Sequence, residues 1–537
     1  MLSVLREFVL VDDAQEPGNN LPQIDDPRFG IAAARKSRTI RRTWLDTFDW
    51  RLFRAGLTLE LLAGRGTTEL VLTGRDGAVV ATEAVSAVNG SRPIRWPSRL
   101  DHLPAGPLRE RLAPVVGVRA LLPVTKATSV LTELRAVNAD EKTIAVLAVE
   151  RMSVTQPHGV HQHGVHQHGA HQHGAQPRTR VAVIPLRGYQ AQASKVADLL
   201  ERTPGVAPAT QSPFEAALAG ADRKPGAYTG KVNVLLTGTM PAALALATVL
   251  GSLFDTVEAN LAGTIADIDT EFLHDLRVAV RRTRSVLKTA KTVLPAAIVG
   301  KYRAEFKWLG EVTTPTRDHD VYLLDLPSMA TRLLAATGQE LEPFGQYLER
   351  QRASAYRQLA RDLRSARFTS LSSRWRRDLD QIASTPAKRP LTSPFAARRI
   401  ARAHRLVLES GAAIQATSPP RALHDLRKLC KELRYLLEVF ASLHDPAQQW
   451  RAVNELKALQ DCLGEFQDTD IQIAELRAFA TAMMADRSAP ATTLLAMGEI
   501  AASLAARQAK ARAEFAGRFA AFASPRGQAR ISALTRA

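Results

Sequence analysis

Leu273-His274-Asp275-Leu276-Arg277 is a stretch that returns 150 residues later as Leu423-His424-Asp425-Leu426-Arg427. A second stretch, Lys307-Trp308-Leu309-Gly310 through Arg317-Asp318-His319-Asp320, returns at the same interval as Lys457-Ala458-Leu459-Gln460 through Gln467-Asp468-Thr469-Asp470. Two motifs that keep their spacing in two places indicate a tandem duplication. Apolar residues recur around both copies at three- and four-residue intervals, which predicts helices. We therefore expect an all-α helical bundle with an internal two-fold repeat, each copy having about four helices.

Each copy of the first motif begins a stripe of basic side chains. The stripe members are His274, Arg277, Arg281, Arg284 and Lys288 in the first copy, and His424, Arg427, Lys431 and Arg434 in the second. These spacings place all members of a stripe on one face of a helix. Like charges at such spacing repel each other, so a stripe is unfavourable unless anions lie against it. A solvated basic face is one interpretation, and the repetition of the stripe, with a histidine at its start, favours an anion-binding site.

The dimensions of the stripes indicate which anion would fit. At the rise of an α-helix each stripe is about 15–20 Å long, which suits an extended polyanion better than a single phosphate. Arginine, lysine and histidine all contact phosphate oxygens, and Lys307 and Lys457 add one cation to each copy. The chain has a net charge of +18 and only 6% aromatic residues. Nucleic acid is the alternative ligand, but single-strand binders usually add aromatic platforms, so a linear phosphate chain is favoured.

The sequence changes character near residue 235. Before that point, short apolar runs between Gly, Pro, Asp and Asn predict the strands 69–73, 78–81, 143–147 and 181–184. After it, such breakers become rare. The predicted fold is α+β and multidomain. Its parts are an antiparallel β-barrel over 1–205, a linker over 206–237 and a helical bundle over 238–530, with repeats at about 238–385 and 386–530.

Cysteine content, apolar segments and a histidine-rich repeat bear on the protein's cellular location and on metal binding. The 537-residue chain has two cysteines, Cys430 and Cys462, which favours a reducing compartment. Its N-terminus has no apolar signal region, and the longest apolar run, 241–254, is shorter than a membrane helix. We therefore expect a soluble cytoplasmic protein that does not enter a membrane. A His-Gln-His-Gly repeat over 158–175 holds seven of the 13 histidines and is predicted to be a surface-loop insertion, with loose metal binding as the alternative.

Both copies of the repeat resemble a known family. Residues 273–284 and 423–435 are similar to the signature helices of CHAD domains (conserved histidine α-helical domains), and 457–470 resembles that family's second motif. The resemblance covers about residues 240–525. It implies two pseudo-symmetric halves around a basic cavity that binds inorganic polyphosphate, and association with polyphosphate granules. The implied phosphate contacts are His274, Arg277, Arg281, Arg284, His424, Arg427, Lys431 and Arg434, together with Arg317, whose counterpart in the second copy is Gln467.

The first half resembles a second family. Residues 43–60 are similar to a strand motif of CYTH domains, the triphosphate-tunnel β-barrels that often precede CHAD domains. CYTH enzymes begin with Glu-x-Glu-x-Lys, whereas 4–10 contains one glutamate, Glu7, and no lysine. Glu60 and Leu62 stand where the family has phosphate-binding arginines. Because paired carboxylates are needed to seat divalent ions, we expect a degenerate barrel without catalytic residues, metal or cofactor.

Metal-dependent phosphate hydrolysis is a further alternative. His274-Asp275 and His424-Asp425 are similar to the His-Asp pair of HD hydrolases, and the aspartates at 318, 320, 468 and 470 could add carboxylates. However, an aspartate one residue after its histidine points about 100° away on a helix. Asp318 and Asp468 also follow a break in the pattern, which predicts N-cap or first-turn positions for them. The favoured function therefore remains binding of polyphosphate without chemistry.

Overall fold

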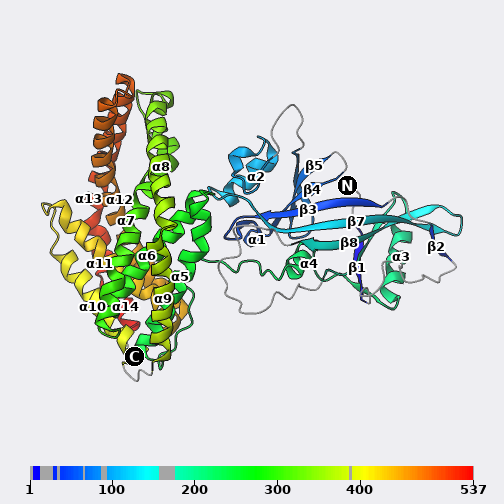
Figure 1. The fold of residues 1–537 in the computed structure, drawn as a ribbon, viewed down its shortest axis with the longest axis horizontal. Helices are drawn as coiled ribbons and strands as arrows, with labels where there is room; N and C mark the ends of the chain where they lie inside the picture. The colour runs from blue at the N-terminus through cyan, green and yellow to red at the C-terminus, as the bar shows by residue number, and fades with distance from the viewer. Residues whose placement is uncertain are drawn as a thin grey trace. The chain divides into compact units, whose positions relative to one another are not determined.

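A computed structural model of the chain describes residues 4–11, 28–32, 37–64, 67–85, 94–155, 176–230, 232–385 and 390–535. The chain divides into two compact units, Met1–Thr229 and Gly230–Ala537. An antiparallel sheet forms the first unit and helices form the second, so the α+β prediction is confirmed (Figure 1). The histidine-rich segment 158–175 lies outside the described residues.

Ten strands make one antiparallel sheet in the first unit. They are β1 (Arg6–Leu10), β2 (Phe29–Ala32), β3 (Arg38–Asp46), β4 (Leu57–Ala63), β5 (Thr68–Gly74), β6 (Val79–Ala84), β7 (Leu122–Asn138), β8 (Thr143–Thr155), β9 (Arg180–Pro185) and β10 (Val206–Pro208). Their order is β10-β1-β9-β8-β7-β3-β4-β5-β6, with β2 paired to β7. The four apolar runs that predict strands lie in β5, β6, β8 and β9, so those predictions are confirmed.

The sheet is open, which corrects the predicted barrel. Within the described ranges, the outermost strands β6 and β10 each pair with one neighbour. Short helices cover the apolar residues that a closed barrel would turn inward: α2 (Pro107–Val116), α3 (Gln190–Arg202) and α4 (Pro213–Gly220). Leu112 of α2 and Leu200 of α3, for example, are fully buried in two separate apolar clusters of the sheet. Burial of these faces by helices removes the need for closure.

The segment 206–237, predicted as a linker, begins with ordered structure instead. It contains β10 and α4, both within the first unit. Ser212 and Glu215 form a capping box at the start of α4, whose first residue is Pro213. Phe214 then stacks on Trp44 with 6.1 Å between ring centroids. The prolines and glycines of this segment therefore mark a helix start and turns.

The second unit contains ten α-helices among its described residues. They are α5 (Ala242–Ile265), α6 (Thr270–Ala290), α7 (Ala296–Ala330), α8 (Glu342–Leu363), α9 (Ala366–Ser384), α10 (Thr392–Ala412), α11 (Pro420–Val439), α12 (Pro446–Ala485), α13 (Ala491–Phe522) and α14 (Pro525–Ala533). A shift of 150 residues relates α5 to α10, α6 to α11 and α7 to α12. Each copy thus has five α-helices, one more than predicted.

Contacts between the copies follow a pseudo-two-fold relation. The Ala242 N–H donates to the Pro390 carbonyl at 2.9 Å, and the Thr392 N–H donates to the Met240 carbonyl at 2.9 Å. Adding 150 to the lower residue of each pair, and subtracting 150 from the higher one, converts one hydrogen bond into the other. The strand-like bridge between Pro241 and Leu391 lies at the centre of this exchange.

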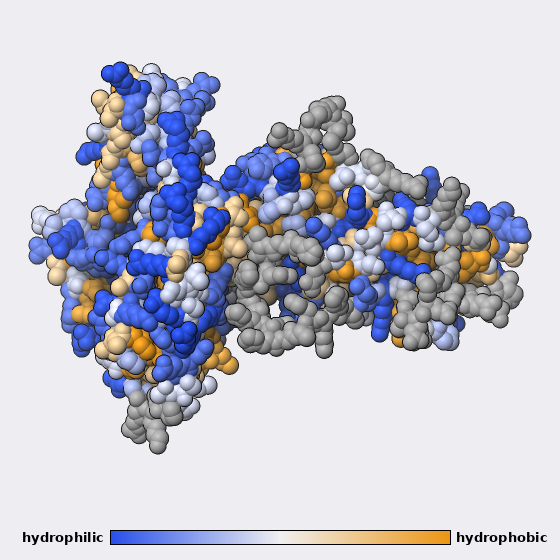
Figure 2. Space-filling view, in the orientation of Figure 1, coloured by the Kyte–Doolittle hydropathy of each residue, from blue (hydrophilic) through white to orange (hydrophobic). Residues whose placement is uncertain are grey.

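Apolar stripes of the helices pack inward, and in Figure 2 apolar residues show only as scattered patches on a largely hydrophilic helical unit. The main core takes in both copies, with Leu250, Phe306 and Leu426 among its buried residues. A second core joins α7 and α8 to α12 and α13. In the described part of the chain, α5 alone is long and apolar enough to cross a membrane by length and composition, and 56% of its most apolar window is buried inside the structure.

Candidate anion-binding site

Two equivalent helices, α6 and α11, carry the basic stripes. Asp269 caps α6 by accepting hydrogen bonds from the N–H groups of Glu271 at 2.9 Å and Phe272 at 3.2 Å. Leu276 of α6 and Leu426 of α11 are fully buried, so each helix turns its apolar face to the main core. The cationic positions then fall on the faces that remain, because they are out of phase with the apolar ones.

The stripes of the two copies meet at Arg281 and Lys431, which are equivalent under the 150-residue shift. Burial, followed by the positive charges of Arg427 and Arg281, lowers the pKa of Lys431 from 10.5 to about 8, against the opposing effect of Asp468. Arg281 belongs to α6 whereas Lys431 and Arg427 belong to α11, so cations from both copies share one region. Such crowding favours a bound anion because it would relieve the mutual repulsion.

The second basic residue of each stripe reaches the following helix. In the first copy, Arg277 Nη1 donates to the Gly310 carbonyl at 3.2 Å and to the hydroxyls of Thr313 at 3.0 Å and Thr314 at 2.8 Å. In the second copy, Arg427 makes a two-pronged ion pair with Asp468, at 2.8 and 3.1 Å. These bonds fix both guanidinium groups in place.

Both histidines lie beside the side chain that follows them by 43 residues. Burial and then the charges of Arg317 and Arg281 lower the pKa of His274, which favours the neutral ring. In the second copy, His424 Nδ1 forms a hydrogen bond with Gln467 Oε1. The substitution of Gln467 for Arg317 therefore exchanges a repelling cation for a hydrogen-bonding amide. Arg317 itself donates to the Thr270 carbonyl at 3.4 Å.

Glutamates neutralise the outer ends of the stripes. Lys288 Nζ pairs with Glu432 at 2.6 Å, and Arg282 pairs with Glu438 at 2.9 Å. These two ion pairs exchange under the 150-residue shift with their charges reversed, and both join α6 to α11. Arg434 also pairs with Glu438, at 2.7 Å, so this stripe member is neutralised as well.

The remaining predicted cations differ in their surroundings. Within the described ranges, Arg281, Arg284 and Lys431 have no carboxylate within ion-pair distance. A methyl group on Gly310 would lie 3.1 Å from Arg284 Nη1, so this arginine lies across α7 where the helix has no side chain. Lys307 is exposed and lies 3.6 Å from Glu311, and Lys457 is exposed on α12.

The sequence did not reveal the residues that form hydrogen bonds or ion pairs with the basic side chains of α6. Thr313 and Thr314 follow the second motif's Gly310 but carry no charge, so a search for cations passes over them. Glu432 and Glu438 lie on α11 itself, six residues apart, and look like ordinary surface carboxylates. Only the contact between the copies reveals that they bind cations of α6.

Asp318 and Asp468 do not cap helices, which corrects that prediction. Helix α7 continues through Pro315 and α12 is unbroken, so both aspartates lie in helix interiors. Burial raises the pKa of Asp318, and the neighbouring Arg277 opposes the rise. Asp320 is 1% exposed and pairs with Arg352 at 2.6 Å. These aspartates face arginines, and the arrangement gives them roles in holding helices together.

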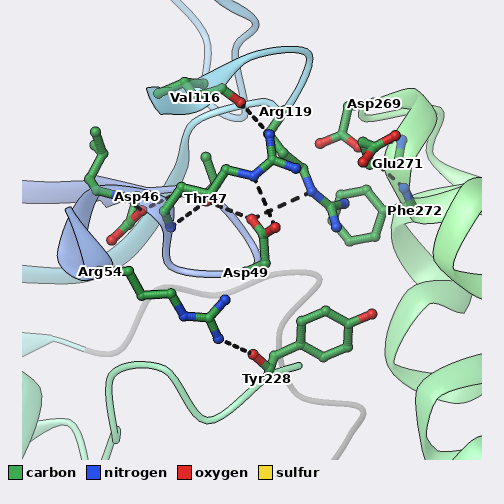
Figure 3. A network of polar contacts seen from close by, with 12 residues as sticks. Asp46, Thr47, Asp49, Arg54, Val116, Arg119, Tyr228, Asp269, Glu271 and Phe272 are labelled. Atoms are coloured by element: carbon green, nitrogen blue, oxygen red, sulfur yellow. Dashed lines mark hydrogen bonds and ion pairs between the residues drawn. The ribbon is translucent and has the colours of Figure 1, made fainter. Parts of the chain in front are cut away.

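A polar network organises the turn after β3 in the first unit. Figure 3 shows Asp46, Thr47 and Asp49 together there. The Asp46 carboxylate accepts the N–H groups of Thr47 at 2.7 Å, and of Leu52 and Phe53 at 2.9 Å each, at the start of the short helix α1 (Arg51–Arg54). Burial raises its pKa to about 6. The Asp-Thr pair of the CYTH-like motif thus stabilises a turn.

Glu60 has a structural partner in the same unit. Together with Glu150 it binds Arg42, and all three side chains are about 15% exposed or less. The Arg42 guanidinium also lies 5.1 Å from the centre of the Trp44 ring. Glu60 is therefore used to neutralise a largely buried cation.

Comparison with family models matches residues 248–477 to the CHAD domain. Residues 248–477 form a CHAD domain. The chain is also similar to the crystal structure of the CHAD domain from the plant Ricinus communis, with 25% identity, coverage of 54% of this chain and 96% of that one, and a TM-score of 0.47. It is similar to PptA from Streptomyces chartreusis, with 18% identity, coverage of 52% and 99%, and a TM-score of 0.41. No curated protein matches it.

The CHAD domain begins within α5 and ends within α12, so it contains both stripes. Helices α13 and α14 follow the matched range and complete the second copy. No match identifies the sheet unit as CYTH, so its resemblance to that family stays a prediction.

Proposed function

We propose that the CHAD domain binds inorganic polyphosphate, without converting it, where the stripes of α6 and α11 meet. CHAD domains are associated with polyphosphate binding. The observation that carries the proposal for this chain is the approach of Arg281 and Arg427 to Lys431, which brings cations of both copies together. A chain of phosphates supplies negative charge along its whole length and would neutralise the two stripes at once.

The described contacts divide the predicted ligands into four groups. His274, Arg281, Arg284 and Lys431 have no described carboxylate partner at ion-pair distance and are the first candidates for phosphate contacts. Arg277 and Arg427 keep donors beyond those already used, because a guanidinium has five N–H groups. We assign Lys288 and Arg434 a weaker role since glutamates neutralise them. Lys307, Arg317, His424 and Lys457 remain proposed contacts at the edges of the site.

Reversal of the central pair tests the proposal. Arg281→Glu combined with Lys431→Glu should lower the affinity for long-chain polyphosphate at least about 100-fold, since each lost charge-assisted hydrogen bond contributes about 1.5 kcal/mol or more. The matched control is Arg350→Glu with Arg357→Glu, two exposed arginines of α8 outside the stripes. Isothermal titration calorimetry on the full chain measures both affinities, and circular dichroism verifies folding. Equal affinities for the two folded variants would rule the site out.

Nucleic acid is the competing ligand, because its backbone offers similar phosphates. Single-stranded RNA added at equal phosphate concentration and equal salt should displace little polyphosphate. Beside the stripes, α6 and α11 offer one aromatic side chain, Tyr435 of α11, whereas single-strand binders usually have several. Ready displacement by RNA would favour the nucleic-acid function instead. Polyphosphate binding would also place the protein at polyphosphate granules, which fluorescence microscopy of the tagged chain can test.

A further inference from the structure

A groove lies on the surface of the helical unit between α12 and the pair α13 and α14. Its cavity measures about 430 Å³, which is within the usual range for sites of small ligands. Phe522 of the groove lining is buried, whereas Trp450 is 63% exposed. Three arginines line the groove: Arg451, Arg518 and Arg530.

The first copy shows what fills the equivalent place there. Trp308 of α7 is equivalent to Ala458 of α12, which lines the groove. The guanidinium of Arg367, from α9, lies 4.2 Å from the centre of the Trp308 ring. The same arginine pairs with Glu305 at 3.0 Å. In the first copy, therefore, an indole lies beneath an arginine that a glutamate holds in place.

The second copy has a similar ion pair but lacks the indole, and its arginine is not the counterpart of Arg367, whose position Gly517 occupies. Glu455, the equivalent of Glu305, pairs with Arg530 of α14. Ala458 leaves space where Trp308 has its ring, and Ala521 on the facing helix α13 is also small. The groove is thus a place for a planar aromatic ring that the chain itself fills in one copy and leaves open in the other.

We propose that this groove binds a nucleotide, with its base in the position equivalent to the Trp308 ring. The base would stack on Arg530 and contact Trp450, as bases do with arginine planes and indoles. The phosphates would bind Arg451, which has no described carboxylate partner, and Arg518, which also pairs with Glu514 at 3.3 Å. Arg530 pairs with Glu455, so the three lining arginines outnumber these two glutamates and the groove stays cationic. An aromatic ring that carries negative charge matches both properties. The proposal does not rest on polyphosphate binding, because none of these residues belongs to a stripe.

ATP binding to the full chain tests this site, and tryptophan fluorescence and calorimetry measure the affinity. Ala458→Trp rebuilds the arrangement of the first copy and should abolish ATP binding while polyphosphate affinity is unchanged. Trp450→Ser alters an exposed side chain and should weaken ATP binding about 5- to 100-fold through lost stacking. The double variant Arg281→Glu with Lys431→Glu tests whether ATP binds at the stripes instead. It should retain ATP binding if the nucleotide occupies the groove.

The outcomes separate the groove from the stripes. Absence of ATP binding by the wild-type chain would overturn the proposal, as would unchanged ATP affinity in both Ala458→Trp and Trp450→Ser. Loss of ATP binding in the stripe variant would assign the nucleotide to the polyphosphate site and also overturn it. Inorganic triphosphate, which lacks a base, should not displace ATP from the groove at equal concentration, and full displacement would refute recognition of the base.

Discussion

Lys431 should make polyphosphate binding sensitive to alkaline pH. Burial lowers the pKa of its amine to about 8, together with the charges of Arg427 on the same helix and Arg281 on α6. Asp468 on α12 opposes this effect. A polyanion in the site would favour the charged amine and raise this pKa again. Binding above about pH 8 would therefore take up a proton.

The size of the effect follows from the two pKa values. A lysine with a pKa of about 8 is protonated in only about 3% of molecules at about pH 9.5. If the complex restores the ordinary value of 10.5, about 90% of bound molecules carry the proton at that pH. The affinity for polyphosphate should then fall about 30-fold between about pH 7 and about pH 9.5.

Lys431→Arg is the matched control, because arginine keeps its charge throughout this range. Calorimetry in buffers of different ionisation enthalpy counts the protons taken up at each pH. The wild-type chain should take up close to one proton more than the variant at about pH 9. An equal loss of affinity in both proteins, with equal proton uptake, would refute the reasoning. In the free protein, the pKa of Lys431 in the folded state lies below its unfolded value. The unfolded chain therefore binds more protons, and this lysine should make stability rise with pH between about 8 and about 10.5.

Three further predictions concern neighbouring features. Burial and two nearby arginines lower the pKa of His274, so a decrease from about pH 7 to about pH 5 should tighten polyphosphate binding in the wild type and less in His274→Gln. Glu432→Gln frees Lys288 and should raise polyphosphate affinity severalfold, with a change below about 1 kcal/mol in the free energy of unfolding by urea; weaker binding would contradict this. Arg352→Met leaves Asp320 buried without its cation and should lower that free energy by about 3–5 kcal/mol, part of which Asp320→Asn should restore.

Helical periodicity explains how much of the site could be predicted. Spacings of three, four and seven residues define one helix face regardless of the tertiary structure, so both stripes could be assigned from sequence. Which stripe cations are neutralised depends on the contact between α6 and α11. The pairs Lys288–Glu432 and Arg282–Glu438 join residues about 150 positions apart in the chain, and no local pattern indicates them.

Two predictions, the helix break before Asp318 and the closed barrel, were wrong because tertiary packing outweighed a local sequence pattern. Pro315 suggested a helix break before Asp318, but the segments on either side of it are held by different cores: Phe306 lies in the main core and Tyr322 in the second core. Tertiary packing thus outweighs the one hydrogen bond that a proline removes. In the first unit, alternating apolar residues predicted the strands correctly. Closure into a barrel depends on whether helices cover the sheet, and α2, α3 and α4 do so.

The reversed ion pairs between α6 and α11 determine which repeat can associate with which. Two first copies brought together in the same geometry would set Arg282 against Lys288, and two second copies would set Glu432 against Glu438. Either association would bring like charges together, whereas the observed pairing of unlike copies makes two attractive contacts. The duplicated halves have thus become mutually selective, and discrimination of this kind rests as much on the repulsive alternatives as on the favourable contacts. If the two repeats were produced as separate polypeptides, they should assemble with each other and not with themselves.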